Sequence, residues 1–211
     1  ADQGVTIYDE PTGTAHQFFQ FFLDGSGVYS ARGHYVLDID GVDWTVPLGG
    51  TRHTSSASNI YQIGLLARGE EINPLEAAPI AHAVGTALGR LTTHQYQQLS
   101  KVAIWPASLT DGSAQAENVG SIPYGALFGI PPESKGGPNY DVIGASWNAR
   151  QRRWANMLRE FGVYAVDGGG GGPVIRGDQF IDSGPKADVL AVMATLHDHF
   201  RLVNNNVQAD E

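Results

Sequence analysis

The chain has 211 residues, a formal net charge of −9 and no cysteine. The absence of cysteine excludes disulfides, thiolate metal ligands and a cysteine nucleophile. No basic run exceeds the Arg152–Arg153 pair, which disfavours nucleic acid and anionic membrane surfaces as partners. No apolar run approaches the roughly 20 residues of a membrane span. Because the chain begins at Ala1 rather than Met, we expect a processed or shortened chain, and its length favours one domain over 1–211.

Residues 1 to about 50 predict an antiparallel meander. Three strand-like segments and two turn sequences alternate: 4–8, 9–13, 14–23, 24–27 and 28–39. The Asp-rich stretch that follows lacks the glycine and glutamate positions of a calcium-binding EF-hand loop, so we interpret Asp40–Gly41 as a hairpin turn and predict no metal site. Residues 51–204 then have mixed α and β character, and a frayed polar tail is expected over 205–211.

A polar loop precedes the first predicted strand of this second region. Residues 51–59 include Arg52, His53 and three serines, and the apolar segment 60–67 after them predicts a buried strand. Donor side chains placed directly before a core strand suit the wall of a sugar-binding groove. A solvated loop is the alternative interpretation.

A helix is predicted from Asn73 or Pro74 to Leu91. Asparagine suits an N-cap, proline suits the first helical position, and apolar residues recur at helical spacing. Pro79 lies inside this span, so a regular helix that starts only there is the alternative. His82 falls among alanines off the apolar stripe, which favours either a cleft or a satisfied position in the core.

The remaining elements centre on a helix that leads into a strand. Strands are predicted at 101–105, 121–132 and 201–203, and a final helix at 186–200. The segment 146–161 carries a helical apolar stripe, and Gly162 stands where a left-handed C-cap belongs. A strand then ends at Asp167, beside five consecutive glycines. Backbone without side chains leaves room for a ligand there, whereas a glycine turn capped by Asp167 is the alternative.

The candidate chemistry follows by elimination. The sequence has no Walker loop, no dinucleotide-binding glycine motif followed by a helix, and no HExxH or GxSxG motif. Two carboxylates could hydrolyse a glycosidic bond, or a His or Tyr could abstract a proton beside a uronate that an Arg neutralises. The candidate catalytic residues are Glu71, His82, Asp111 and Asp167, and the candidate substrate-binding residues are Arg52, His53, Arg68 and Tyr124. No cofactor is expected.

Several short pieces resemble an uncharacterised group of exported, strand-rich bacterial proteins, many of them actinobacterial. The pieces are GLLAR..E (64–71), PIAHA (79–83), PASLTDG (106–112), IPYGALFGIPP (122–132) and FGVYAVD (161–167). The resemblance implies an extracellular or cell-surface setting and supplies no reaction. Glu71, His82, Asp111 and Asp167 lie in these pieces, whereas the five-glycine run departs from the pattern.

Together these features predict an α+β domain: an antiparallel β-sandwich or jelly-roll-like sheet system with about three packed helices. We expect an exported glycan-active protein that cleaves a polysaccharide or oligosaccharide by hydrolysis or elimination. The alternative is a non-catalytic carbohydrate-binding module or an extracellular structural or interaction module. Exposed Trp and Tyr in a groove without convergent carboxylates would favour binding, and convergent carboxylates, or His with Tyr and Arg, would favour catalysis.

Overall fold

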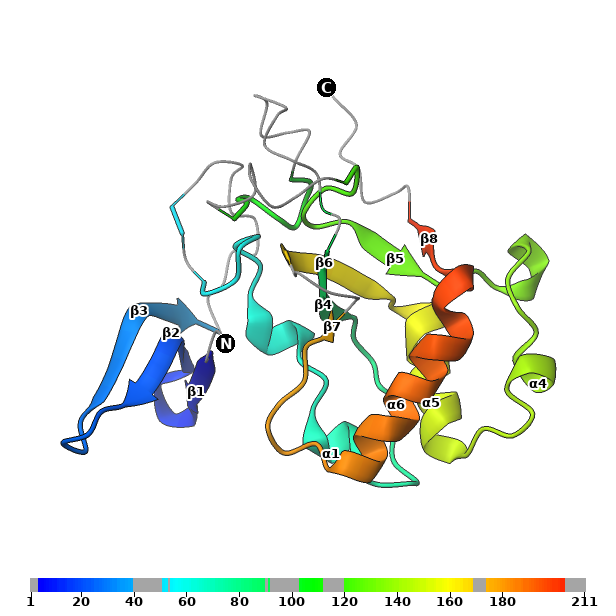
Figure 1. Cartoon of the computed structure of the whole chain (residues 1–211), viewed down its shortest axis with the longest axis horizontal. Coiled ribbons are helices and arrows are strands. Elements are labelled where there is room, and N and C mark those ends of the chain that lie inside the picture. The colour runs from blue at the N-terminus through cyan, green and yellow to red at the C-terminus, as the bar shows by residue number, and fades with distance from the viewer. Residues whose placement is uncertain are drawn as a thin grey trace.

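The computed structural model describes residues 4–39, 51–52, 54–89, 91, 103–111, 120–168 and 174–203. These residues form two β-sheets and four α-helices, which confirms the α+β class (Figure 1). Within the described part of the chain, no helix has the length and apolar character that crossing a membrane requires. The expectation of one domain over the whole chain stays a prediction.

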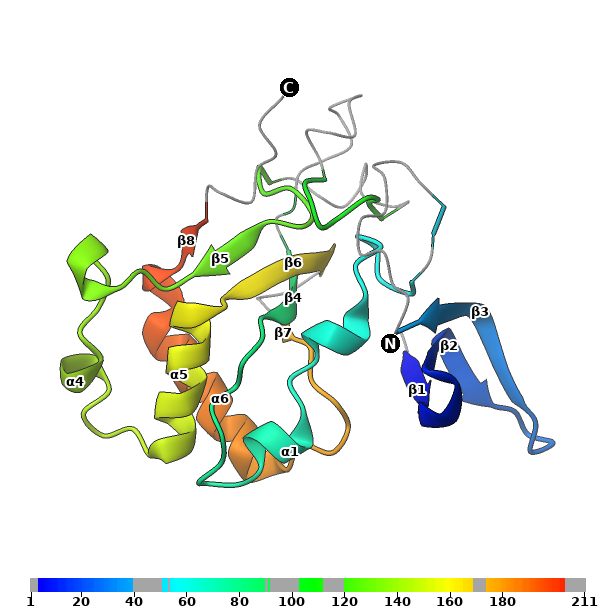
Figure 2. The ribbon, with the colours of Figure 1, turned by 180° about the vertical axis from the view of Figure 1, so that it is seen from behind.

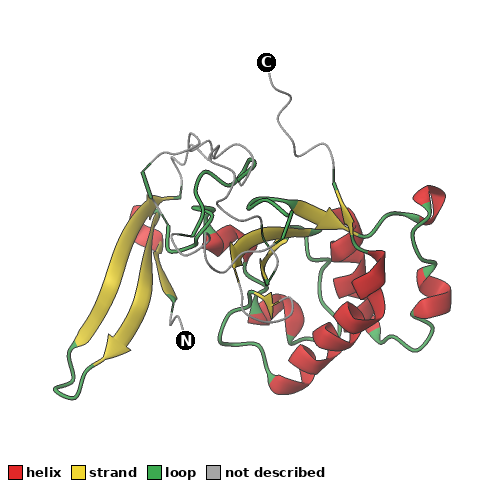
Figure 3. Ribbon diagram, turned by 45° about the horizontal axis from the view of Figure 1, so that its top comes forward, coloured by secondary structure: helices red, strands yellow, loops and turns green. Residues whose placement is uncertain are grey.

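The first sheet is the predicted N-terminal meander. Its strands are β1 (Val5–Asp9), β2 (Thr14–Leu23) and β3 (Tyr29–Asp38), all antiparallel in the order β1-β2-β3. Figure 3 shows this sheet standing beside the helical part of the molecule. Side chains alternate between its faces: Ala15 and Leu37 are buried against Tyr61 of the following region, whereas Ile7 and Val36 are exposed on the other face.

The second sheet is mixed rather than antiparallel. Its order is β7 (Val174–Ile175), β4 (Val84–Leu88), β6 (Val163–Gly168), β5 (Leu127–Gly129) and β8 (Arg201–Leu202). Strands β4 and β6 pair in parallel, and the other pairs are antiparallel. The antiparallel expectation therefore holds for the first sheet and is wrong for the central pair of the second.

The α-helices are α1 (Gly69–Ile72), α4 (Tyr140–Ile143), α5 (Ala149–Glu160) and α6 (Ser183–Leu196). Figure 2 shows α5 and α6 lying next to each other below the second sheet. Asn148 caps α5 by accepting a hydrogen bond from the Gln151 backbone amide, and Gly162 follows it with a φ of 73°. The predicted helix, left-handed glycine and strand over 146–167 are thus confirmed.

Two buried clusters lie on opposite faces of the second sheet. The larger one packs α5 and α6 on the sheet and includes Ile72, Ile80, Val84, Trp154, Leu158, Val163, Val192 and Leu196. The other includes Ile60, Leu91, Ala103, Tyr124, Ala165 and Val166. Burial of apolar side chains on both faces explains why β4 and β6 are apolar along most of their length.

The predicted helix from Asn73 or Pro74 to Leu91 is wrong. Helix α1 ends at Ile72, none of the described residues between 73 and 91 is helical, and Val84–Leu88 forms strand β4 between β6 and β7. The apolar spacing matched a helix because a strand buried on both faces also lacks a period of two. Pairing with β6 and the β-branched Val84 and Thr86 favour the strand.

The predicted strand over 60–67 is also wrong. The segment contains a 3-10 helix, η2 (Gln62–Leu65), and Ala67 alone bridges to Gly177. The predicted strand over 121–132 is shortened to β5, with single bridges at Ile122 and Tyr124, since the prolines at both ends cannot donate to a ladder.

The C-terminal elements follow the expected order. Helix α6 begins three residues before the predicted start and is followed by a 3-10 helix, η4 (His197–His199), and the predicted last strand is present as β8. Of the predicted strand over 101–105, Ala103 bridges to Tyr124. The Asp40–Gly41 turn, His53, the last four of the five glycines and the tail over 205–211 lie outside the described residues.

Candidate functional site

A β-bulge at the end of β6 puts Tyr164 and Asp167 on one face of the second sheet. In the pairing with β4, Tyr164 lies opposite Gly85 and Asp167 opposite Ala87, with a register shift between Thr86 and Ala87. Tyr164 and Asp167 are three residues apart and would face opposite sides of a regular strand. The bulge inserts one extra residue between them, so both side chains face the same side of the sheet.

Gly85 leaves room on that face for a long side chain. A Cβ atom at Gly85 would lie 3.1 Å from Cγ2 of Val166 and 3.6 Å from Cδ of Arg176. The Arg176 side chain therefore crosses β4 at its glycine and reaches the end of β6.

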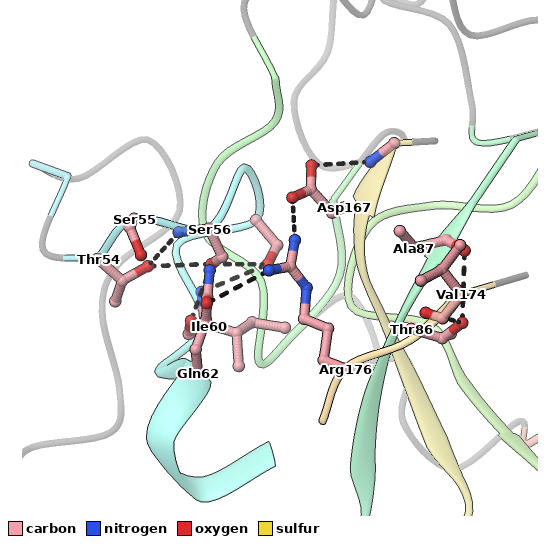
Figure 4. Close-up of polar contacts among 12 residues, drawn as sticks. Thr54, Ser55, Ser56, Ile60, Gln62, Thr86, Ala87, Asp167, Val174 and Arg176 are labelled. Carbon is pink, nitrogen blue, oxygen red and sulfur yellow. Dashed lines mark hydrogen bonds and ion pairs between the residues drawn. The ribbon is translucent and has the colours of Figure 1, made fainter. Parts of the chain in front are cut away.

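The guanidinium of Arg176 joins two segments that are far apart in the sequence. It forms an ion pair with Oδ2 of Asp167, whose Oδ1 accepts a hydrogen bond of 2.9 Å from the Gly168 amide. Its Nη1 donates to Oε1 of Gln62 over 3.3 Å, across 114 residues of sequence (Figure 4). Gln62, Asp167 and Arg176 together form a polar cluster. Asp167 and Arg176 are both partly exposed, so this polar cluster is accessible from solvent.

An aromatic cavity of about 370 Å³ adjoins the polar cluster. Its lining residues are Asn59, Ile60, Tyr61, Gly64, Leu65, Trp105, Pro106 and Tyr164. Trp105 is 44% exposed, the largest solvent-facing ring of this cavity, whereas Tyr61 is buried. Burial raises the pKa of the Tyr164 hydroxyl above its ordinary value, so this group stays a hydrogen-bond donor at neutral pH. The volume is near the lower end of the roughly 300–1,000 Å³ typical of small-molecule sites.

The turn that carries Trp105 is held on two sides. Ile104 donates its amide hydrogen to Tyr124 O over 2.8 Å, and Ala107 donates to Ile104 O over 2.8 Å. Gly125 has a φ of 85°, and a Cβ there would lie 2.0 Å from Ile104 O. This close approach of two backbones requires glycine, and it fixes where Trp105 projects.

Three hydroxyl side chains of the polar loop before η2 are buried rather than solvated. Thr54, Ser56 and Ser58 are fully buried, and their hydroxyls lie within hydrogen-bond distance of one another, 3.0 Å for Thr54 to Ser56 and 3.3 Å for Ser56 to Ser58. Asn59 extends this network by donating to the Ser108 hydroxyl over 2.9 Å. The solvated-loop alternative is therefore wrong for these residues: the hydroxyls form an internal scaffold behind the cavity, because buried polar groups need partners. Asn59, the last residue of this loop, lines the cavity, and the groove-wall interpretation stays a prediction.

Three predicted substrate-binding residues take other positions in the structure. Arg52 donates to the backbone carbonyls of Ser56 and Thr110 and so braces the polar loop. Tyr124 is fully buried in the second core cluster, which leaves it no surface for a substrate. Arg68 is exposed, and its guanidinium lies 3.9 Å from the Glu70 carboxylate.

Glu71 and His82, both predicted as catalytic, form a pair. His82 Nε2 lies 2.9 Å from Glu71 Oε1, and His82 Nδ1 lies 2.8 Å from Ala83 O. The other oxygen of Glu71 accepts from the Arg68 amide over 3.1 Å and caps α1. Since both ring nitrogens face acceptors, neither directs a lone pair at a substrate. The pair fastens α1 to the start of β4.

The Glu71–His82 pair and Asp167 lie at opposite ends of β4. His82 precedes β4, whereas Asp167 pairs with Ala87 near its end. Five extended residues span roughly 16 Å, and Figure 1 shows α1 well away from the tip of β6. Paired carboxylates of glycosidases are about 5–9.5 Å apart. Asp111, the fourth predicted residue, directly follows Thr110, whose carbonyl accepts from Arg52.

Of the predicted residues that the structure describes, which leaves out His53, Asp167 alone belongs to the polar cluster beside the cavity. The sequence reasoning missed Gln62, Trp105, Tyr164 and Arg176. A tryptophan followed by proline in a loop was the one usable signal among them, since a large ring in a proline turn has few neighbours to bury it.

Comparison of the chain with protein-family models, with curated proteins and with solved structures gave no match. The resemblance to exported bacterial proteins and the extracellular setting that it implies therefore stay predictions.

Proposed function

We propose that this protein binds a carbohydrate in the cavity lined by Tyr61, Trp105 and Tyr164. A sugar ring presents C–H groups on its faces and hydroxyls around its edge. The exposed ring of Trp105 suits packing against the C–H face, because aromatic side chains combine a large apolar surface with a polar edge. The single observation that carries the proposal is this solvent-facing tryptophan on a rigid turn over an aromatic cavity.

The polar cluster beside the cavity supplies partners for hydroxyl groups. Gln62 follows Tyr61 in the chain, and Asp167 lies on the same face of the sheet as Tyr164. Amide, carboxylate and guanidinium groups are the usual orienting groups of such sites.

The charge of this cluster favours a neutral glycan. Asp167 compensates Arg176 directly, and the whole chain carries −9. A uronate polymer would meet no uncompensated cation in the described cluster and would be repelled by the net charge. This part of the proposal departs from the expectation of elimination next to a uronate.

Binding has better support than cleavage. Asp167 is ion-paired and Glu71 is engaged by His82. Roughly 16 Å of extended chain separates His82 from Ala87, the residue that pairs with Asp167. Cleavage by hydrolysis or elimination stays a prediction. The sandwich or jelly-roll layout and the extracellular location expected from the sequence are further parts of this proposal.

A panel of neutral and acidic polysaccharides tests the proposal. The chain is run through gels that contain each polymer, and retardation reports binding. Each mixture is also incubated, and released oligosaccharides are sought by mass spectrometry. We expect retardation by at least one neutral glycan and intact polymer. Products that carry an added water, or unsaturated products, would show hydrolysis or elimination instead, and no retardation by any polymer would contradict the proposal.

A further inference from the structure

Two histidines face each other on the exposed face of the first sheet. His16 lies on β2 and His34 on β3, and His16 Nδ1 is 3.0 Å from His34 Nε2. The register places Ile7 and Val36 on either side of His16, and both are exposed. The pair is thus on the face opposite the contact with Tyr61, and neither histidine lines the aromatic cavity.

A stacked phenylalanine and the contact between the two histidines hold the rings. The Phe18 ring is stacked on the His34 ring, with centroids 4.6 Å apart and planes at 6°, and the His34 and His16 rings are 5.2 Å apart at 16°. Phe18 and His34 are also direct partners in the antiparallel register, so backbone pairing and ring contact both fix the position of His34.

The separation of the two nitrogens fits neighbouring ligands of one metal ion. With metal–nitrogen bonds of about 2.0–2.1 Å, two ligands at a right angle are about 2.8–3.0 Å apart, and two ligands at a tetrahedral angle about 3.3–3.4 Å apart. The observed 3.0 Å matches the right-angle arrangement, which square-planar or octahedral Cu²⁺ and Ni²⁺ adopt.

We propose that His16 and His34 together bind one Cu²⁺ or Ni²⁺ ion. In the metal-free pair, one ring donates its N–H to the other. Metal binding requires the donating ring to move that proton to its other nitrogen, and both rings to turn away from the N–N line so that their lone pairs converge on the ion. Among the described residues, no three His, Asp or Glu side chains gather into a metal-binding group, so water molecules complete the coordination. Ca²⁺ and Mg²⁺ are not expected at this site, because they require oxygen ligands and both ligands here are imidazoles. Of the two ions proposed, Cu²⁺ should bind to the histidine pair more tightly than Ni²⁺.

Titration of the untagged chain with NiCl₂ and CuCl₂, followed by calorimetry, tests the site. We expect one ion per chain, and weakening of about tenfold or more in His16→Gln and in His34→Gln, because one imidazole is a far poorer chelator than two. Glutamine retains hydrogen-bonding capacity at these positions, and circular dichroism checks that each variant folds. His199→Gln is the control, from η4 outside the first sheet, and its affinity should equal that of the unchanged chain.

Electron paramagnetic resonance of the Cu²⁺ form gives a second measurement, in which we expect splitting from two equivalent imidazole nitrogens. Equal affinity in the unchanged chain and both sheet variants would overturn the proposal. So would loss of binding in His199→Gln, or a Cu²⁺ spectrum that keeps the splitting from two nitrogens in His16→Gln.

Discussion

Side-chain type alone did not separate catalytic from structural roles in this chain. Glu71 and His82 have the chemistry of an acid–base pair, yet each atom that could act on a substrate already has a partner in the protein. Buried polar groups that are fully hydrogen-bonded stabilise local structure. Here the hydrogen bonds of Glu71 and His82 join α1 to the segment just before β4.

We therefore predict that His82→Ala lowers the free energy of unfolding by about 1–3 kcal/mol, the usual cost of leaving a partly buried carboxylate without its donor. Urea denaturation monitored by tryptophan fluorescence measures this. Glycan binding at the cavity should be unchanged, because the pair lies at the other end of β4. Loss of binding or turnover at full stability would instead place His82 in the functional site.

Tyr140 provides a pH-dependent contribution to stability. Its hydroxyl donates to Ala155 O over 3.0 Å, and the Arg159 guanidinium carbon lies 3.5 Å from its ring centroid. Burial raises the pKa of Tyr140 to about 12, although the charge of Arg159 acts in the opposite direction.

Because the folded pKa exceeds the unfolded value of 10.0, the contribution of Tyr140 is complete below pH 10 and is lost as pH rises towards 12. The free energy of unfolding should fall by about 2–3 kcal/mol when this contribution is lost. Unfolding free energies of the unchanged chain and Tyr140→Phe, compared between pH 8 and 11.5, isolate this residue from the other alkaline titrations. Parallel curves for the two proteins would contradict the prediction.

At the scale of single elements, the junction between α5 and β6 depends on one glycine. Gly162 has a φ of 73°, and a Cβ there would lie 2.2 Å from Phe128 O of strand β5. The residue thus combines a left-handed conformation with close contact to a neighbouring strand.

We predict that Gly162→Ala destabilises the fold by roughly 3 kcal/mol or more, since the left-handed conformation costs about 1–2 kcal/mol and the contact forces the strands apart. Gly136→Ala is the matched control, because Gly136 has a φ of 78° with no atom within 4 Å of an added Cβ. Thermal unfolding measures both variants. Equal losses would show that the contact with Phe128 contributes nothing.

The elements that could be predicted are those with a strong local signal. The meander and the helix at 149–160 have alternating or helical patterns with caps at their ends, so local preference and the final structure agree. Strand β4 could not be identified, because its apolar spacing reflects burial on both faces. The 3-10 helix at Gln62–Leu65 lacks any capping residue that would mark its start.

At the scale of the whole molecule, the candidate site is built from distant segments. Tyr61 and Gln62, Trp105, Tyr164 and Asp167, and Arg176 come from four stretches of the chain. Asp167 could be found because it ends a strand beside glycines. Arg176 could not, since its position depends on the space above Gly85 and on a bulge that no local pattern announces.

The measurement that tests the central claim most directly is the affinity of Trp105→Ala for the neutral glycan that the unchanged chain retains. Calorimetric titration should show a loss of roughly 30-fold or more, as expected when a central aromatic contact worth about 2 kcal/mol is removed. Tyr29→Ala, which removes a ring that is 65% exposed on the first sheet, should bind like the unchanged chain. Unaltered affinity in Trp105→Ala, with the fold intact, would contradict the placement of the carbohydrate in this cavity.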